Sequence, residues 1–401
     1  MPVLNEDLVA ENSAALTFAA ADITWIISLG VSVFSENSTG IYMPYNMNWL
    51  INNGETVSGS GRAVESIGAA SSVFNAESGL IVGLYGVEMV GVHSFLNNNG
   101  TISGLSDVYS GIGVYMRGDF ADILNVGTIS GDRSVVLDSI FNEARIRNAG
   151  IISGDDIGID AVKMLATDAN GVLTISNDGT IGGDWSISSQ YQTRLTNSGL
   201  LSGAVSLGDS ADYFRNAGTV IGQTELGAGD DQFDGRGGSS EGWLVNGGAG
   251  EDSLIGGASE DSFNGGDDKD ILRGLAGDDL LQGGRGADSL LGGRGGDMFL
   301  YSATTESGID AATRDTIRDF STAEGDLIDL GLIDAMTGRN GNQAFKFIGA
   351  SEFTGRAGEL RYELAAGGGV LVLGNTDTDL DAEFSLLLKG ASSLSSGDFV
   401  L

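Results

Sequence analysis

The feature that most constrains the fold of this chain is a run of six uninterrupted nine-residue repeats from Gly247 to Leu300. They read GGAGEDSLI, GGASEDSFN, GGDDKDILR, GLAGDDLLQ, GGRGADSLL and GGRGGDMFL. In each repeat a glycine-rich turn ends in an aspartate, and a short segment with one large apolar residue follows. Apolar residues phased at a fixed period indicate a solenoid whose coils share a core. An acidic glycine-rich linker would lack this phased residue.

The chemistry of these turns predicts calcium binding. Ca²⁺ is a hard cation that takes about six to eight oxygen ligands, which turn carbonyls and aspartate carboxylates supply. Two nonapeptides are expected to form one coil, so that aspartates two repeats apart stack on the same edge. The two predicted edges are Asp252, Asp270 and Asp288, and Asp261, Asp279 and Asp297. An earlier copy of the repeat, LGAGDDQFD from Leu226, adds Asp231. The turn glycines expected to contribute to the sites are Gly248, Gly250, Gly257, Gly266, Gly277, Gly284, Gly286, Gly293 and Gly295.

Two departures from the repeat weaken the sites that use them. Ser259 and Asp268 replace the fourth glycine of their turns. The insertion GRGGSSEGWLVN from Gly235 leaves the number of ions open. Calcium between stacked carboxylates would remove their mutual repulsion, so metal binding is expected to supply folding free energy. The repeats are therefore predicted to be disordered without calcium and ordered with it.

The charge and cysteine content agree with this expectation. The chain has 55 acidic and 20 basic residues, a formal net charge of −35, and no cysteine. Such a balance attracts cations and argues against binding to nucleic acid or to anionic membrane surfaces. The absence of cysteine excludes disulfides and thiolate chemistry, and it suits a chain that stays unfolded until export.

A second repeat occupies the N-terminal half. It reads INNGETVSG from Ile51, LNNNGTISG from Leu96, LNVGTISG from Leu124, RNAGIISG from Arg147, SNDGTIGG from Ser176, TNSGLLSG from Thr196 and RNAGTVIG from Arg215, with a weaker copy, NAESGLIVG, from Asn75. The spacing of about 19 to 29 residues predicts the coils of a parallel β-helix. Asn-x-Gly is interpreted as a left-handed corner, and the following Thr-Ile-Ser as a short strand with one apolar residue inward.

The N-terminal repeat region begins with an apolar stretch and ends next to the calcium repeats. The apolar stretch from Ala14 to Phe34 contains Asp22 and lacks flanking basic residues, so it predicts buried strands rather than a membrane span. The N-terminus lacks the basic region of a secretory signal peptide. At the other end, LGDSADYF from Leu207 can be laid over LGAGDDQF from Leu226. We therefore expect the β-helix to continue directly into the calcium repeats.

The nonapeptides resemble the repeats-in-toxin (RTX) pattern G-G-x-G-x-D-x-U-x, and residues 314–401 resemble the C-terminal domain of the serralysin metalloproteases. The second resemblance rests on RDTIRDF from Arg314, GDLIDL from Gly325, NQAFKFIG from Asn342, FTGRAGELRY from Phe353 and the terminal GDFVL. It implies a domain that packs against the β-roll and carries an uncleaved signal for type I secretion. The ending from Asp398 to Leu401 looks like that signal, and it also fits a last β-strand. The resemblance further implies calcium ligands at Asp319 and Asp326.

One segment departs from the serralysin pattern. The Gly-Asp-rich turn of that family is replaced here by GNTDTDLDAEF. Asn375, Asp377, Asp379 and Asp381 alternate along this segment. Whether they bind calcium is left open by the sequence.

The sequence favours a protein without catalytic activity. A metzincin-type zinc site needs two or three histidines, and the only histidine is His93, within the strand-like run GVHSFL. The enzymatic alternative is a β-helical polysaccharide lyase, hydrolase or epimerase. Its best carboxylate cluster is Asp155, Asp156 and Asp160, with Lys163 nearby. A polar β-helix corner explains these residues better.

These observations predict an all-β chain in which a parallel β-helix continues into a calcium-bound parallel β-roll, capped by a C-terminal β-rich domain. The expected boundaries are 1–225, 226–300 and 301–401. The expected function is that of a secreted, calcium-binding structural or cell-surface protein of bacteria, of the surface-layer, matrix or adhesin type. Its expected partners are calcium, the type I secretion machinery and either further copies of itself or a cell-surface polysaccharide, without nucleic acid and without a membrane span.

Overall fold

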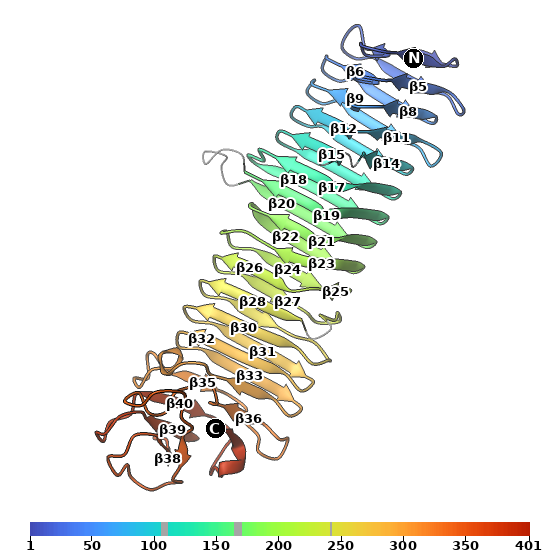
Figure 1. The fold of residues 1–401 in the computed structure, drawn as a ribbon. Coiled ribbons are helices and arrows are strands. Elements are labelled where there is room, and N and C mark those ends of the chain that lie inside the picture. Colours follow the sequence, from blue (N-terminus) through green and yellow to red (C-terminus); the bar gives the residue numbers. More distant parts are fainter. Residues whose placement is uncertain (106–110, 164–170, 241–242) are drawn as a thin grey trace. The chain divides into compact units, whose positions relative to one another are not determined.

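The computed structural model describes residues 1–105, 111–163, 171–240 and 243–401 (Figure 1). The chain divides into two compact units, Met1–Gln223 and Thr224–Leu401. Within the described residues, the regular structure is β-strand apart from two short 3₁₀ turns, η1 (Thr304–Glu306) and η2 (Ser396–Asp398). The all-β prediction is therefore confirmed. No helix among the described residues is long and apolar enough to cross a membrane.

Unit 1 is a parallel β-helix. One face, here called sheet A, takes one strand from each coil, and neighbouring strands pair in parallel and in register. Its strands are β1 (Val3–Leu4), β4 (Thr24–Ile27), β7 (Trp49–Asn52), β10 (Ser72–Asn75), β13 (Phe95–Asn98), β16 (Ala121–Asn125), β18 (Glu143–Asn148), β20 (Val172–Asn177), β22 (Gln192–Asn197) and β24 (Tyr213–Asn216).

The remaining strands of unit 1 form the opposite part of each coil, here called sheet B. They are β2 (Leu8–Ala10), β3 (Leu16–Thr17), β5 (Ser32–Ser35), β6 (Ile41–Met43), β8 (Glu55–Ser58), β9 (Arg62–Ser66), β11 (Leu80–Gly83), β12 (Tyr85–Val90), β14 (Thr101–Gly104), β15 (Ile112–Arg117), β17 (Thr128–Asp138), β19 (Ile151–Val162), β21 (Thr180–Ser189), β23 (Leu200–Ser206) and β25 (Thr219–Ile221). The earlier coils contribute two strands each. From β17 onward the two merge through a bulge, because β17 pairs with both β14 and β15.

The core of unit 1 consists of apolar columns that run from coil to coil. In sheet A one column is fully buried and comprises Leu50, Val73, Leu96, Ile123, Ile146, Ile175, Leu195 and Phe214. Each such side chain stabilises the fold by about 1.5–3 kcal/mol relative to an exposed one. The expected inward residue of the Thr-Ile-Ser segments is also confirmed, since Ile102 and Ile129 are fully buried.

The Asn-x-Gly corner differs from its interpretation as a left-handed turn. The motif asparagines are buried and form a ladder in which the side-chain amide of each donates to the next, as from Asn98 Nδ2 to Asn125 Oδ1 at 2.8 Å. The ladder members are Asn52, Asn75, Asn98, Asn125, Asn148, Asn177, Asn197 and Asn216. The motif glycines do not adopt positive φ. Glycine is needed instead because a Cβ on Gly127 would lie 2.0 Å from the carbonyl oxygen of Gly100.

Two other expectations for unit 1 have clear outcomes. The stretch from Ala14 to Phe34 forms short strands, β3, β4 and part of β5, as predicted, but their side chains are only partly buried. His93 lies outside the strands, in a turn with φ of 58°, so its assignment to a strand is wrong. Its ring is exposed and stacks on Phe120 at 4.7 Å between ring centroids.

Unit 2 begins with the β-roll. Its strands up to Leu300 are β26 (Thr224–Ala228), β27 (Gln232–Asp234), β28 (Leu244–Ala249), β29 (Ser253–Ile255), β30 (Ser262–Asp267), β31 (Ile271–Ala276), β32 (Leu280–Arg285), β33 (Ser289–Arg294) and β34 (Met298–Leu300). Paired strands lie two nonapeptides apart, as Leu272 opposite Leu254 and Phe263 opposite Leu281 show. Two repeats therefore form one coil, as predicted, and their apolar residues are buried.

The parallel pairing extends past Leu300. The later strands are β35 (Asp315–Ile317), β36 (Leu327–Asp329), β37 (Lys346–Phe347), β38 (Glu359–Leu364), β39 (Val370–Asn375), β40 (Phe384–Leu388) and β41 (Phe399–Val400). β35 pairs with β33 and β36 with β34, so this segment adds a further coil to the roll. β38, β39 and β40 form an antiparallel group. The C-terminal β41 pairs with β36, so the expected last strand is present.

Candidate metal centre

Two rows of stacked aspartates run through unit 2. In each row the backbone N–H of one aspartate donates to Oδ1 of the aspartate in the next coil, at 2.8–3.1 Å. The first row is Asp231, Asp252, Asp270, Asp288 and Asp315, and the second is Asp261, Asp279, Asp297 and Asp326. The structure thus stacks the repeat aspartates on the two edges that the spacing predicts. Their role as calcium ligands stays a prediction.

The second oxygen of most of these carboxylates is buried and free. Oδ2 has no hydrogen-bond partner among the described residues in Asp252, Asp270, Asp279, Asp288 and Asp297. Each of these five faces the first glycine of its own repeat. A Cβ on Gly265 would lie 2.3 Å from Oδ2 of Asp270, and a Cβ on Gly274 would lie 2.0 Å from that of Asp279. The first glycine therefore leaves the space that the carboxylate occupies.

Burial makes these carboxylates costly to ionise without a cation. Burial, reinforced by the carboxylates of Asp288, Asp252 and Asp268, raises the pKa of Asp270 to about 8. In the other row burial raises the pKa of Asp279 to about 7, again reinforced by neighbouring carboxylates. Buried oxygen donors with raised pKa values and no partner are the arrangement that a bound cation would stabilise.

The other turn positions separate into two kinds. The second glycines Gly248, Gly266, Gly284 and Gly293 and the fourth glycines Gly250, Gly277 and Gly295 have positive φ. A Cβ on Gly248 would also lie 1.8 Å from the carbonyl oxygen of Gly227. Gly257 and Gly286 do not have positive φ. Gly286 is needed for close approach, since its Cβ would lie 1.9 Å from the carbonyl oxygen of Asp268.

Three non-glycine residues stand at glycine positions of the turns. Asp268 has a φ of 79°, and Leu275, which replaces a second glycine, also has a φ of 79°. An L-residue is strained in this region, a leucine more than an aspartate. Ser259 avoids positive φ. The sequence analysis did not predict this strain at Leu275.

Some candidate ligands already have partners. Oδ2 of Asp261 accepts from the N–H of Gly257 at 2.7 Å, and its Oδ1 accepts from Ser240. Asp326 accepts from the N–H groups of Asp297 and Ser321. Asp319 lies beside the second row, where its Oδ1 accepts from the N–H of Gly292 at 3.2 Å. Burial raises the pKa of all three carboxyl groups.

Sequence reasoning missed Asp315 and the first glycines of the repeats. Asp315 continues the first row, and burial together with the carboxylate of Asp288 raises its pKa. A signal was present: Asp315-Thr-Ile repeats the Asp-Ser-Leu pattern of Asp288-Ser-Leu. Its spacing of 27 rather than 18 residues from Asp288 concealed it.

The donor set fits calcium. The rows offer hard carboxylate oxygens, several of them buried and without a partner, next to glycine turns whose carbonyls approach closely. Sulfur and imidazole ligands, which suit transition metals, do not take part, since the chain has no cysteine and His93 lies in unit 1. When bound, calcium would supply the positive charge that these stacked carboxylates lack.

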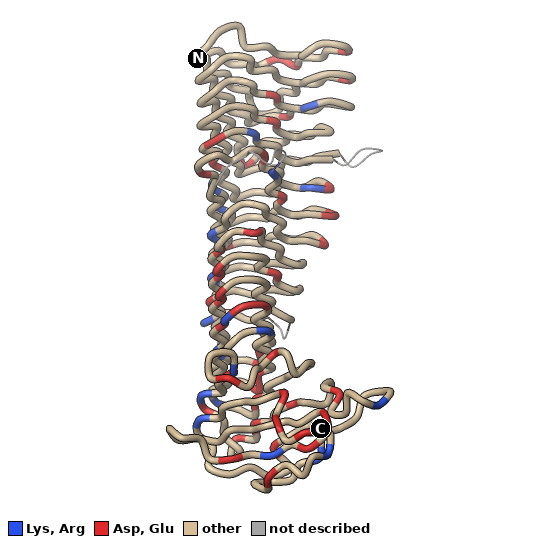
Figure 2. Tube along the Cα trace, turned by 90° about the vertical axis from the view of Figure 1, so that its left-hand side faces the viewer, with Lys and Arg blue, Asp and Glu red and all other residues tan. Residues whose placement is uncertain are grey.

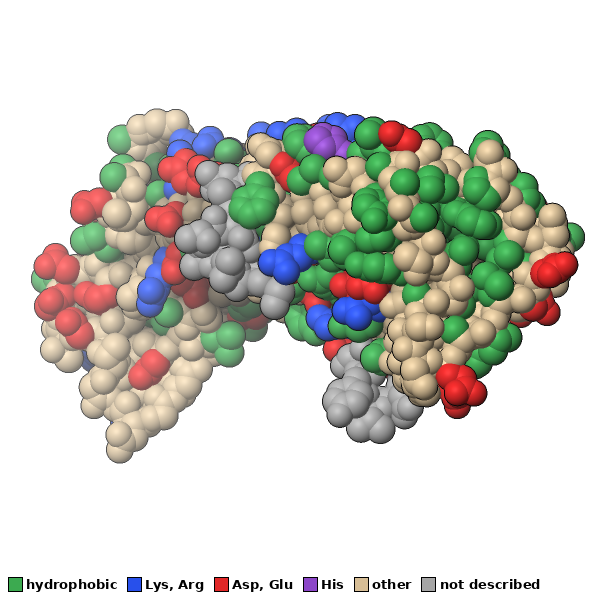
Figure 3. Space-filling view, turned by 90° about the horizontal axis from the view of Figure 1, so that it is seen from above, with side chains coloured by type: hydrophobic (Ala, Val, Ile, Leu, Met, Phe, Trp, Pro, Cys, Tyr) green, Lys and Arg blue, Asp and Glu red, His purple; other side chains and the backbone are tan. Residues whose placement is uncertain are grey.

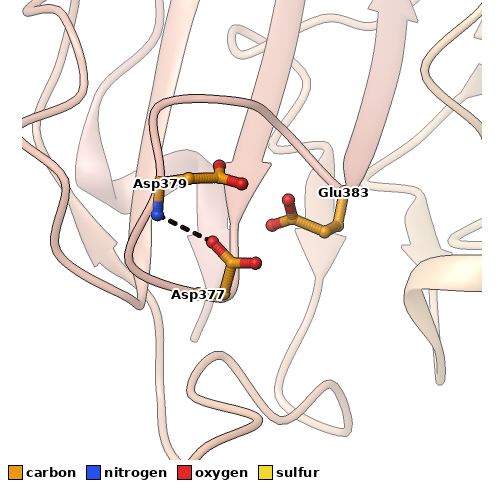
Figure 4. A group of neighbouring side chains, drawn as sticks. All are labelled: Asp377, Asp379 and Glu383. Carbon is orange, nitrogen blue, oxygen red and sulfur yellow. Dashed lines mark hydrogen bonds between the residues drawn. The ribbon is translucent and has the colours of Figure 1, made fainter.

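A separate acidic loop joins β39 to β40. Carboxylate oxygens of Asp377, Asp379 and Glu383 lie within 4.8 Å of one another, and the N–H of Asp379 donates to Asp377 (Figure 4). The side chain of Asn375 instead shapes the loop, because its amide donates to the carbonyls of Asp379 and Asp381. Glu383 was not among the expected residues. Calcium binding in this loop stays a prediction.

The carboxylate cluster of the enzymatic alternative lies on β19. Asp160 is buried and forms an ion pair with Arg133 at 2.9 Å. The ammonium group of Lys163 lies over the ring of Tyr191, 5.2 Å from its centroid. Asp155 and Asp156 are exposed at the irregular part of the strand. Asp160 and Lys163 thus have structural partners.

The coils of glycine–aspartate turns and their two carboxylate rows define a calcium-binding β-roll protein. The chain belongs to a specific family of this class: the model of the peptidase M10 serralysin C-terminal domain matches residues 118–401. Domains of this type bind calcium and are secreted by bacteria.

Comparison with solved structures finds a similarity to the AlgE6R3 subunit of the Azotobacter vinelandii mannuronan C5-epimerase, determined in solution. The sequences are 26% identical, the match covers 39% of this chain and 78% of that one, and the TM-score is 0.28. No curated protein matches the chain.

Proposed function

We propose that this protein is a secreted, calcium-dependent structural component of the bacterial cell surface or extracellular matrix, exported by a type I system and folded after export. The observation that carries the proposal is the pair of aspartate rows with buried, unpartnered Oδ2 atoms. A chain that buries so many carboxylates is stable only where calcium is abundant.

The proposed order of events follows from the energetics of these rows. Where calcium is scarce, ionised Asp252, Asp270 and Asp288 would repel one another and lose hydration, so the roll stays unfolded. About millimolar external calcium matches the affinity of extracellular calcium modules. Ligand binding to the folded state alone then shifts the equilibrium by mass action, and folding outside the cell becomes effectively one-way.

The C-terminal segment supports a role for the unfolded chain in export. In the folded protein β41 pairs with β36, and Ser395 and Asp398 form a reciprocal capping interaction in η2. If β41 contains the secretion signal, the secretion machinery can bind it only before β41 pairs with β36. Low cytosolic calcium would keep it accessible.

A structural role is favoured over catalysis. The best carboxylate cluster of the β-helix contains Asp160 in an ion pair with Arg133 and Lys163 against an aromatic ring. Glycoside hydrolysis usually needs two carboxyl groups that flank the scissile bond. We propose that Asp155 and Asp156 are exposed residues of a polar corner.

The test is size-exclusion chromatography with light scattering, first in chelator and then in millimolar calcium, together with circular dichroism. We expect an expanded chain to become compact and to gain β structure, and a structural component to form large ordered assemblies. A calcium-independent profile would contradict calcium-dependent folding. A compact monomer at all concentrations would contradict self-assembly.

A further inference from the structure

A row of aromatic rings lies on the outer face of sheet A in unit 1. Trp49 on β7, Phe74 on β10 and Phe95 on β13 follow one another across three coils. The ring centroids of Trp49 and Phe74 lie 5.7 Å apart, and those of Phe74 and Phe95 lie 5.6 Å apart. Trp49 is 46% exposed, and the two phenylalanines are half-buried. We call these three residues the aromatic row.

The surface around the aromatic row differs from the rest of sheet A. Ile26 and Ile51 occupy the same outward column as Phe74, whereas arginines occupy the same face farther along the unit. These are Arg145, Arg147, Arg194 and Arg215. Figure 2 shows Lys and Arg recurring on one side of the middle coils and few on the first coils. Figure 3, which looks from above onto the N-terminal end, shows hydrophobic side chains gathered there. An exposed apolar surface of this kind usually marks a binding site.

Hydrogen-bonding groups follow directly after the rings. Asp122 lies opposite Phe95 in the next coil and forms an ion pair with Arg147 at 2.9 Å. Asn97 lies opposite Phe74, and its Oδ1 is buried without a hydrogen-bond partner among the described residues. Beside Asp122 lies a pocket of 230 Å³. Its lining residues are Phe120, Ala121, Asp122, Glu143 and Arg145.

We propose that the aromatic row binds a neutral polysaccharide whose chain runs across the strands of sheet A. The C–H faces of pyranose rings are apolar and weakly positive, so they stack on the negative faces of aromatic rings. Neighbouring coils are about 4.8 Å apart, close to the advance of one sugar in an extended chain. Sugars of a chain that crosses these coils contact Trp49, Phe74 and Phe95, of which Trp49 and Phe74 are nearly parallel and Phe95 meets Phe74 edge to face, and their hydroxyl groups contact the Asp122–Arg147 pair.

The charges of the protein select a neutral polymer. The chain carries a formal net charge of −35, which repels polyuronates, nucleic acids and anionic lipid surfaces. The charged residues that flank the aromatic row, Asp122 and Arg147, neutralise each other. The remaining lone pairs of the paired carboxylate and the remaining N–H groups of the guanidinium can form hydrogen bonds with sugar hydroxyl groups. The proposal names a partner for the cell-surface role proposed above, but it rests on unit 1 and not on the aspartate rows.

The experiment is affinity electrophoresis of the full-length protein, saturated with calcium, through gels that contain dextran, a soluble β-1,3-glucan or hydroxyethylcellulose. We expect at least one polymer to retard the wild type, and Trp49→Ala to weaken the retardation by about tenfold or more, as for a buried aromatic anchor. Trp185→Ala is the matched control, since Trp185 is 39% exposed on β21 of sheet B and should leave retardation unchanged.

A second variant keeps the test valid if Trp49→Ala perturbs folding. Phe95→Leu retains an apolar side chain and removes the ring, and it should also reduce retardation while the calcium-dependent circular dichroism stays that of the wild type. Absence of retardation by all three polymers would overturn the proposal. So would equal losses in Trp49→Ala and Trp185→Ala, or a Trp49-dependent dimer in light scattering, or Trp49-dependent binding to neutral lipid vesicles. None of these outcomes would alter the calcium response, so the two proposals fail separately.

Discussion

The backbone N–H of Asp252 donates to Oδ1 of Asp270, eighteen residues later, at 2.8 Å. The same carboxylate holds its Oδ2 buried, without a partner and against the first glycine of its own repeat. One oxygen therefore joins two coils of the roll, and the other is available to a cation. The relationship recurs in the second row between Asp261 and Asp279.

Neutralising one aspartate in each row should abolish the ordering of the roll by calcium. In Asp270→Asn with Asp279→Asn, each row loses a carboxylate whose Oδ2 is buried, and the amide that replaces it lacks the negative charge on which calcium affinity depends. We expect circular dichroism to show no calcium-induced gain of β structure in the roll. The matched control, Glu251→Gln with Glu260→Gln, removes two exposed charges from the turns of the two preceding repeats and should respond as the wild type does. A normal response in the double aspartate variant would show that the rows are not the ligand edges.

The first glycines can be tested by adding a single methyl group. In Gly265→Ala and Gly274→Ala the new Cβ would lie 2.3 and 2.0 Å from Oδ2 of Asp270 and Asp279, so the carboxylates must move. We expect the half-saturating calcium concentration to rise by about tenfold or more, as for groups that orient metal ligands. Gly338→Ala, which meets nothing within 4 Å, is the control. Equal midpoints in all three variants would mean that carboxylate position is unimportant.

The calcium-free roll should depend on pH. Burial raises the pKa of Asp270 from its ordinary value of 3.8 to about 8 and that of Asp279 to about 7. The folded state then binds more protons than the unfolded state between about pH 4 and pH 8, so its free energy of unfolding falls as pH rises through this window. After removal of calcium on a chelating resin, we expect more β structure at pH 5 than at pH 8.

Calcium affinity should change in the opposite direction, because ligation requires ionised carboxylates. The double variant Asp270→Asn with Asp279→Asn should show a weaker pH dependence of its calcium-free state. More order at pH 8 than at pH 5 would contradict the raised pKa values.

The asparagine ladder should stabilise unit 1. Asn98 accepts from Asn75 Nδ2 and donates to Asn125 Oδ1, both at 2.8 Å, and it is fully buried. Asn98→Ala removes both of these buried hydrogen bonds and should lower the free energy of unfolding by about 1–3 kcal/mol. Urea denaturation in saturating calcium measures this loss. Asn99→Ala, at an exposed position, should cost much less, and equal losses at both positions would argue against the ladder.

The periodicity of the sequence predicted the architecture because stacked coils repeat the same physical environment. The spacing of 18 residues predicts one row for Asp252, Asp270 and Asp288, and the structure has them in one row. Asn-x-Gly was misinterpreted, since a pattern of turn-favouring residues does not reveal that Asn98 faces inward and that Gly127 is needed for close approach between coils.

Other features depend on contacts that local patterns do not record. Asp315 joins the first row although the loop between β34 and β35 disrupts the period. The alternating acids of residues 375–381 suggested a common set of ligands, whereas the side chain of Asn375 binds loop carbonyls and Glu383 takes its place near Asp377. Glu383 lies near Asp377 because the loop turns back before β40 begins. The boundaries at 225 and 300, and the continuity of the two repeat regions, stay predictions.

The most direct test of the central claim is hydrogen–deuterium exchange of the whole protein with and without calcium. The account predicts that amides of 244–300 exchange rapidly in chelator and become protected in millimolar calcium, while those of the β-helix coils from β18 to β24 are protected in both. Protection of 244–300 that is the same in chelator and in calcium would contradict the claim that the aspartate rows couple calcium binding to folding.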